Sequence, residues 1–157
     1  MRRLLGMAMV MIALMAGCTR SAGEAGEPVE FRALAEDYDD GGDHSSGLFV
    51  VRTQPEWEQR WQGLTIRHTP PPPPPAVDWT TEMVIFYVLG TKPSGGYSVR
   101  IDEISARDGR LAVRVEESRP GRSCATAAVL TNPLDVVATR ASDAPIEVDL
   151  DSDSHRC

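Results

Sequence analysis

The stretch TEMVIFYVLG (residues 81–90) decides the fold, because it is the most apolar part of the chain beyond residue 17. From Met83 to Leu89 it is rich in β-branched and aromatic residues, which pack well on a pleated surface. A short continuous apolar run of this kind is typical of a strand buried within a sheet. We therefore predict a central buried strand here.

Six further stretches are predicted to be strands from runs or alternation of apolar residues. They are VEFRALAED (29–37), SGLFVVRT (46–53), YSVRIDEISA (97–106), LAVRVEES (111–118), Leu134–Ala138 and PIEVDL (145–150). The Asp-Gly pair in RDGR (107–110) predicts a tight hairpin turn. The expected fold class is α+β, with six or seven short, mostly antiparallel strands in a sandwich or a partly open barrel.

One short amphipathic helix is predicted within TQPEWEQRWQGL (53–64), where Thr53 and Glu56 form a capping-box pattern. Trp57 and Trp61 are four residues apart and lie on one helix face. We expect them to plug one end of a small core; stacking on a sugar or nucleobase is the alternative. The six prolines at 70–75 are expected to form a stiff surface insertion, or else a ligand for an aromatic groove.

The N-terminus has the pattern of a bacterial export signal, in which two arginines precede an apolar run that is too short to span a bilayer. Met15-Ala16-Gly17-Cys18 resembles a lipobox, although leucine is usual at the position of Met15. We therefore predict a lipoprotein signal peptide at 1–17 and lipidation of Cys18 by diacylglycerol and an amide-linked palmitate. An ordinary signal peptide or a short membrane anchor is the alternative.

The rest of the chain is predicted to be a tether and one domain. Residues 18–28 are small, polar and glycine-rich, as in a flexible tether, and 29–157 has the size of a single domain. Thr19 stands where an aspartate retains some lipoproteins in an inner membrane. We expect an exported, membrane-anchored protein, in the outer membrane facing the periplasm or at the cell surface if the cell has two membranes.

The formal net charge is −7 and becomes −9 when the two arginines of the signal are removed. This acidic balance argues against nucleic acid as a partner and against anionic lipid headgroups bound through a charged face. Attachment to a membrane is expected through the lipid instead. The remaining cysteines, Cys124 and Cys157, are an even pair in an exported chain, which favours a disulfide between them. Two free thiols, or an intermolecular bond from Cys157, are the alternatives.

The sequence offers little support for catalysis. The three histidines are scattered along the chain, and no serine lies in a Gly-x-Ser-x-Gly elbow. The acidic run at 37–41 lacks the third ligand of a calcium loop, and Ser154 replaces the required glycine in the run at 149–153. We predict a protein without catalytic residues, metal or cofactor.

The loop GTKPSGGYSV (90–99) is the candidate partner contact and contains the only lysine of the chain. Its glycines permit a close backbone approach, and freed backbone amides could bind a peptide carbonyl or carboxylate. The alternative is a wide hairpin connection whose tyrosine packs on the sheet. The candidate binding residues are Lys92, Pro93, Ser94, Gly95, Gly96 and Tyr97.

Several motifs together resemble the C-terminal domain of the PrcB protease-complex subunit family. They are Val77-Asp78-Trp79, MVIFYVLG, GTKPSGGYSVRIDEI and TNPLDVV, within residues 48–150. The chain departs from the family pattern at Leu134-Asp135, where an aromatic-histidine pair is commoner, and in the proline insertion. The resemblance implies a small exported lipoprotein without catalytic residues, in a family named for a subunit that accompanies and stabilises a cell-surface subtilisin-like protease.

The loop at 92–97 is also similar to the Pro-Thr-Thr-Gly-Tyr loop of chagasin-type cysteine-protease inhibitors, and Arg119-Pro120 echoes their second loop. We expect a lipid-anchored envelope protein that binds another envelope or secreted protein, such as a protease, as an accessory subunit. A protease inhibitor that uses the same loop is one alternative. A structural envelope domain with no partner at the loop is another.

Overall fold

The computed structural model describes residues 26–35, 41–42 and 44–157, which form two four-stranded sheets and one helix. The outer sheet has the order β1 (Glu27–Pro28), β5 (Ser98–Arg107), β6 (Arg110–Pro120) and β8 (Ile146–His155). The central sheet has the order β2 (Phe31–Ala35), β7 (Leu134–Arg140), β4 (Glu82–Val88) and β3 (Gly47–Val51). All neighbouring strands are antiparallel except β6 and β8.

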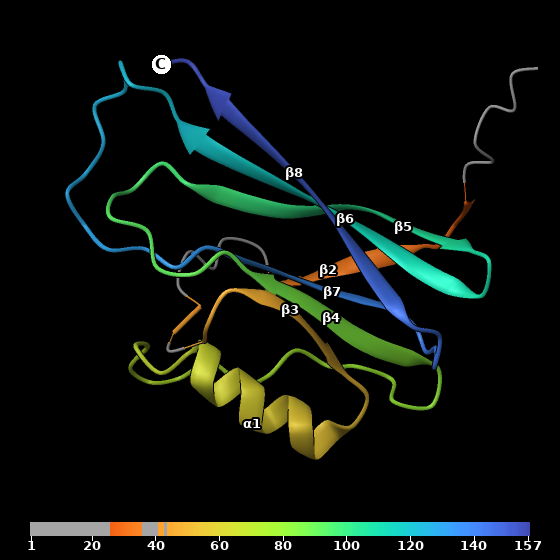
Figure 1. The fold of residues 1–157 in the computed structure, drawn as a ribbon. Coiled ribbons are helices and arrows are strands. Elements are labelled where there is room, and N and C mark those ends of the chain that lie inside the picture. The colour runs from red at the N-terminus through yellow and green to blue at the C-terminus, as the bar shows by residue number, and fades with distance from the viewer. Residues whose placement is uncertain (1–25, 36–40, 43) are drawn as a thin grey trace, which may run out of the picture.

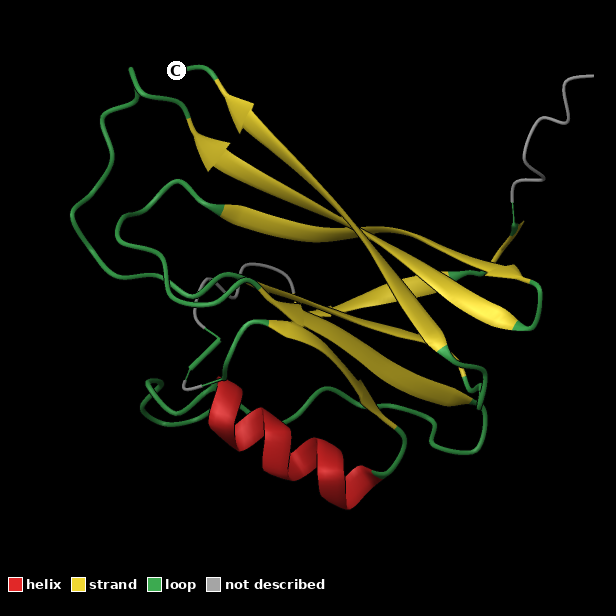
Figure 2. Ribbon diagram, in the orientation of Figure 1, coloured by secondary structure: helices red, strands yellow, loops and turns green. Residues whose placement is uncertain are grey.

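The layers are stacked in the order outer sheet, central sheet, helix α1 (Gln54–Leu64) (Figures 1 and 2). The predicted α+β class and the mostly antiparallel sandwich are confirmed, and the arrangement is not a closed barrel. The described residues contain eight strands rather than six or seven. The additional strand is β1, whose two residues are too few to show any periodicity.

Strand β4 is buried on both faces, as predicted from its sequence. Met83 and Ile85 belong to the core between the two sheets, whereas Val84, Phe86 and Val88 belong to the core between the central sheet and α1. All five side chains are fully buried. β4 pairs with β3 on one side and with β7 on the other, so its main chain is satisfied as well.

The helix covers the face of the central sheet that is turned away from the outer sheet, with Trp57, Trp61 and Leu64. The two indoles are core residues, as predicted, but they cover a face of the sheet rather than plug one end of the core. The proline run lies against this helix rather than standing apart as a spacer. The indole N–H of Trp57 donates to the carbonyl of Pro75 at 3.1 Å, and that of Trp61 to the carbonyl of Pro72 at 2.9 Å. Both buried indole donors are thereby satisfied.

The hairpin between β5 and β6 follows the prediction. Asp108 and Gly109 have φ angles of 51° and 72°, as a two-residue turn with two left-handed positions requires. A register shift between Ile101 and Glu103 keeps Ile104 on the buried face.

Two local predictions need correction. Thr53 stands at the N-cap but makes no side-chain capping bond, and the carboxylate of Glu56 lies 3.9 Å from the guanidinium of Arg60, one turn further along the helix. The end of the predicted tether is already part of the outer sheet, since Glu27–Pro28 pairs with β5.

The predicted signal peptide, Cys18 and most of the predicted tether lie outside the described residues. Within the described part of the chain, no helix has the length and apolar character needed to cross a membrane.

The helix and the proline run should depend on each other for stability. We expect Trp61→Phe to lower the free energy of unfolding by about 1–3 kcal/mol. The substitution removes the hydrogen bond from the indole N–H to the carbonyl of Pro72 and leaves a small cavity. Urea unfolding followed by circular dichroism measures the change. Ile66→Val, at an exposed side chain just beyond the helix, is the control and should have little effect. Equal stability of Trp61→Phe and the unaltered chain would contradict this account.

Candidate functional site

The candidate loop lies at one end of the sandwich, where it connects β4 to β5, and a second segment runs alongside it (Figure 1). Lys92 and Thr131 exchange both backbone hydrogen bonds, at 2.7 and 3.2 Å, and the N–H of Gly95 donates to the carbonyl of Ala127 at 3.0 Å. The hydroxyl of Thr131 donates to the carbonyl of Ser94 at 3.0 Å. We call residues 91–97 and 126–131 together the double loop.

Lys92 is directed into the protein rather than toward a partner. Its Nζ lies 3.5 Å from Oε1 of Glu117 on β6 and 5.6 Å from the centre of the Tyr97 ring. Only 23% of the Lys92 side chain and 11% of the Glu117 side chain is exposed. The other Glu117 oxygen accepts a hydrogen bond from Ser152 of β8 at 2.9 Å. Lys92 therefore ties the loop to the outer sheet.

Some of the other candidate residues pack against the protein, and the rest are exposed. Tyr97 packs against the core between the sheets, and Ser94 and Gly95 are half-buried against the second segment. Pro93 and Gly96 are exposed. Gly96 has a φ of 88°, and a Cβ there would lie 3.3 Å from both Pro120 and Thr126, so its glycine is a structural requirement.

The outward surface of the double loop is uncharged and partly apolar. Val129 is 52% exposed and Leu130 65% exposed, although both are large aliphatic side chains. Residues 126–131 contain no charged residue, and the only charged residue of 91–97 is Lys92. Contiguous apolar surface without charge is typical of the centre of a protein–protein interface.

Cys124 and Cys157 form a disulfide, with their Cα atoms 5.1 Å apart. The bond joins the segment after β6 to the end of β8, beside the hydrogen bond from the N–H of Gly121 to the carbonyl of His155. It therefore fixes the start of the segment that forms half of the double loop. His155 offers a ligand atom within 4.8 Å of both sulfurs, but those sulfurs are bonded to each other.

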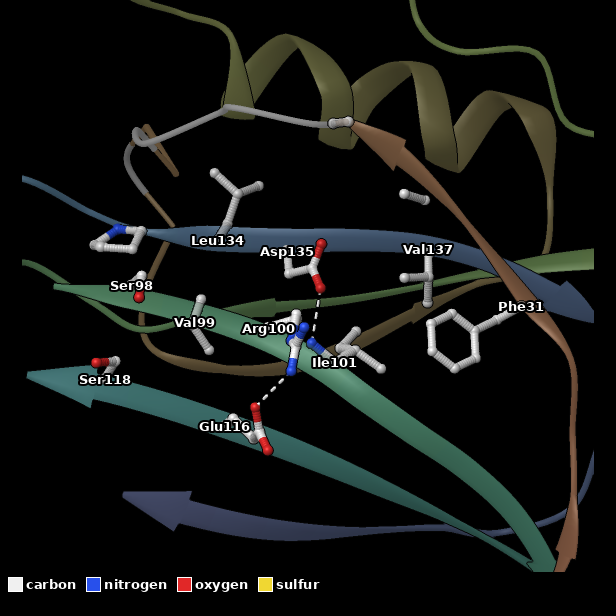
Figure 3. A pocket seen from close by; sticks show the side chains of 13 residues that line it. Phe31, Ser98, Val99, Arg100, Ile101, Glu116, Ser118, Leu134, Asp135 and Val137 are labelled. Carbon is white, nitrogen blue, oxygen red and sulfur yellow. Dashed lines mark hydrogen bonds and ion pairs between the residues drawn. The ribbon is translucent and has the colours of Figure 1, made fainter. Parts of the chain in front are cut away.

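A second feature is a cleft of about 690 Å³ between the two sheets, at the side where β5 faces β7 and β2 (Figure 3). Apolar side chains line its floor and walls, among them Phe31, Val99 and Val137. Ser98 directly follows the first half of the double loop in sequence, and Pro133 lies two residues after the second half; both line the cleft. The cleft therefore begins next to the double loop.

Asp135 lies in this cleft and connects the two sheets. It projects from β7, and its Oδ2 accepts the backbone N–H of Ile101 on β5 at 2.7 Å (Figure 3). Oδ1 accepts the N–H of Val136 at 2.9 Å. Burial raises the pKa of Asp135 above its ordinary value of 3.8, while the two N–H donors and the charge of Arg100 act in the opposite direction.

Arg100 is paired with two acids beside the cleft, Glu116 and Asp102. The guanidinium lies 2.8 Å from Glu116 and 3.0 Å from Asp102, and only Arg100 and Glu116 line the cleft itself. These residues were not predicted from the sequence to form a site. One signal was present, because Asp135 interrupts the apolar strand Leu134–Ala138 with a charge.

The contact between Lys92 and Glu117 should stabilise the loop. We expect Lys92→Met to lower the free energy of unfolding by about 1–2 kcal/mol, because it leaves the carboxylate of Glu117 without its cation. The double variant Lys92→Met/Glu117→Gln should recover part of this loss, as a double-mutant cycle in urea detects. Additive effects of the two substitutions would contradict the coupling.

The raised pKa of Asp135 has a defined effect on stability. The folded chain binds this proton more tightly than the unfolded chain, so the contribution to stability is complete below pH 3.8 and is lost as the pH rises through the folded pKa. We expect the stability of the unaltered chain relative to Asp135→Asn to fall as the pH rises from about 3 to about 6. Urea unfolding of both proteins across this range measures the difference. A relative stability that grows with pH would contradict the assignment.

Comparison with known proteins gives one result. Residues 83–140 match the family model described as PrcB C-terminal. The matched stretch runs from β4 to β7 and includes both halves of the double loop as well as Asp135. The predicted resemblance is confirmed over these residues, and the chain contains a PrcB-like C-terminal domain. No curated protein and no solved structure matches the chain.

Proposed function

We propose, from the PrcB-like C-terminal domain at 83–140, that the chain is a non-enzymatic accessory subunit that binds and stabilises an exported protease. The resemblance connects this domain with a subunit of a protease complex. The proposal assigns no reaction to the chain itself. The protease supplies the chemistry, and the chain supplies a folded surface.

The observation that carries the proposal is the uncharged surface of the double loop. Charged residues make up 25% of the chain, yet the exposed part of the double loop has Val129, Leu130 and Pro93 at its surface and no outward charge. Burial of such side chains against a partner is favourable at about 25 cal/mol per Å² of apolar area. The backbone bonds between the two segments hold this surface in shape before binding, which lowers the entropy cost.

The proposed location of the protein is the cell envelope. The export pattern of residues 1–17, Cys18 at the lipobox position and the polar segment that follows support lipid anchoring at the N-terminus. An anchored accessory subunit would keep its protease at the membrane surface. The proposed destination is the outer membrane where the cell has two membranes.

Protease inhibition is a second candidate, which one specific contact favours. The exposed Gly96 lies next to Pro120, so the two short motifs that are similar to chagasin-type inhibitor loops lie side by side. An inhibitor and an accessory subunit would use the same surface with opposite effects on the protease.

A deletion experiment in the organism's own cells distinguishes an accessory subunit, an inhibitor and a structural domain. We expect proteolytic activity at the envelope, measured with labelled casein, to fall on deletion and to return when the full chain is restored. A rise in activity would instead identify an inhibitor. Unchanged activity would overturn both proposals and leave a structural domain.

Restoring the deleted chain in variant form tests whether the surface of the double loop is the contact. We expect Val129→Ser/Leu130→Ser to reduce co-purification of the protease with the tagged full chain by at least about tenfold, or ~1.4 kcal/mol. Val148→Ser/Leu150→Ser, which alters aliphatic side chains 43% and 44% exposed on β8, is the matched control and should retain the protease. Both variants must unfold at the same temperature. Equal retention of the protease by both would exclude the double loop as the contact.

A further inference from the structure

Strand β5 has a free edge along the cleft. Its neighbour β1 pairs only with Ser105 and Ala106, so within the described residues the part from Ser98 to Glu103 has no strand beside it on that side. Across the cleft, β2 pairs with β7 only from Val136 onward, which leaves Asp135 next to the opening. An uncovered strand edge is a template for pairing with another extended chain.

The direction of the free main-chain groups follows from one hydrogen bond. The N–H of Ile101 points away from β6, because it donates to Asp135 on β7. Groups two residues apart on a strand point the same way, so the N–H and carbonyl of Val99 and the carbonyl of Ile101 also face the cleft. An extended segment that enters here can bond to these three groups, and its alternate side chains face the apolar lining.

The charge of the cleft selects the side chain that fits. Asp135 and Glu116 line the cleft together with Arg100, and Asp102 also contacts that arginine. Glu116 and Asp102 each form an ion pair with Arg100, whereas Asp135 interacts with that guanidinium only through its charge. Each oxygen of Asp135 accepts only one hydrogen bond within the described chain. A carboxylate oxygen can accept two, so both retain capacity for a donor from a ligand.

We propose that the cleft binds an extended segment of a protein partner, which pairs with the free edge of β5 and directs an arginine or lysine side chain to the carboxylates of Asp135 and Glu116. This inference rests on the proposed function and deepens it, because it names the part of the partner that the chain holds. The cleft begins beside the double loop, so one partner can occupy both surfaces.

The test uses a synthetic extended peptide as the probe. Fluorescein-labelled acetyl-Thr-Val-Arg-Val-Thr-amide is titrated against the full chain in detergent, with fluorescence anisotropy as the readout. The matched peptide has citrulline in place of arginine, which keeps the shape and removes the charge. We expect the arginine peptide to bind at least about tenfold more tightly, and hydrogen exchange in the segment Ser98–Ile101 to slow when it binds.

Variants identify the carboxylates. Asp135→Asn and Glu116→Gln should each reduce the preference for arginine over citrulline by about fivefold or more, because each removes one charge from the cleft. Asp102→Asn is the matched control; it removes a contact of the same guanidinium but does not line the cleft, and the preference should stay within about twofold. Glu116, whose side chain is 46% exposed, keeps the test valid if Asp135→Asn fails to fold.

Three outcomes would overturn the inference. The first is that neither peptide binds, and the second is that both bind equally. The third is that the preference for arginine over citrulline falls as much in Asp102→Asn as in Asp135→Asn and Glu116→Gln. If deletion of the chain lowers envelope proteolysis while neither peptide binds, the accessory function stands and the cleft inference alone fails. If the peptides bind as expected while deletion leaves proteolysis unchanged, the cleft binds cationic segments of another kind of partner.

Discussion

The structure depends on one constraint, which is that β4 is apolar on both faces. A strand of this kind is stable only where both faces are covered and both edges are paired. The outer sheet covers Met83 and Ile85, and helix α1 covers Val84, Phe86 and Val88. The three-layer arrangement follows from this requirement, since neither the second sheet nor the helix can be removed without exposing one face of β4.

The same arrangement determines which surfaces remain for a partner. The helix and the proline run occupy the far face of the central sheet, where the two indoles bond to proline carbonyls. The ends and sides of the sandwich are less fully covered, because the strands of the two sheets diverge and β1 is short. The double loop closes one end, and the cleft lies where β5 and β7 separate. The candidate surfaces are therefore consequences of how the core is covered.

Features that depend on residues close in sequence could be predicted. Asp108-Gly109 encodes its turn locally, and Trp57 and Trp61 share a helix face because of their spacing. The apolar run of β4 needs no partner to be recognised as a buried strand. Motifs around the loop at 90–97 also sufficed to predict the PrcB-like domain that the family match confirms.

Features that depend on distant residues could not be predicted. Nothing in GTKPSGGYSV shows that Lys92 points inward to Glu117, which lies on another strand. The proline carbonyls become acceptors only because α1 places two indoles against them. Asp135 is visible in the sequence as an acid within an apolar strand, but its bond to Ile101 exists only because the two sheets meet there. The double loop and the cleft are thus made by contacts between segments far apart in sequence, whereas the strands themselves are encoded locally.

The central claim is that the chain holds an exported protease against the end of the sandwich that the double loop forms. Site-specific photo-crosslinking in the intact envelope tests it most directly, with a photoreactive amino acid at Leu130 and, separately, at Asp108 in the turn at the opposite end (Figure 1). We expect an adduct that contains a protease from position 130 and none from position 108. No protease adduct from position 130, or equal adducts from both positions, would contradict it.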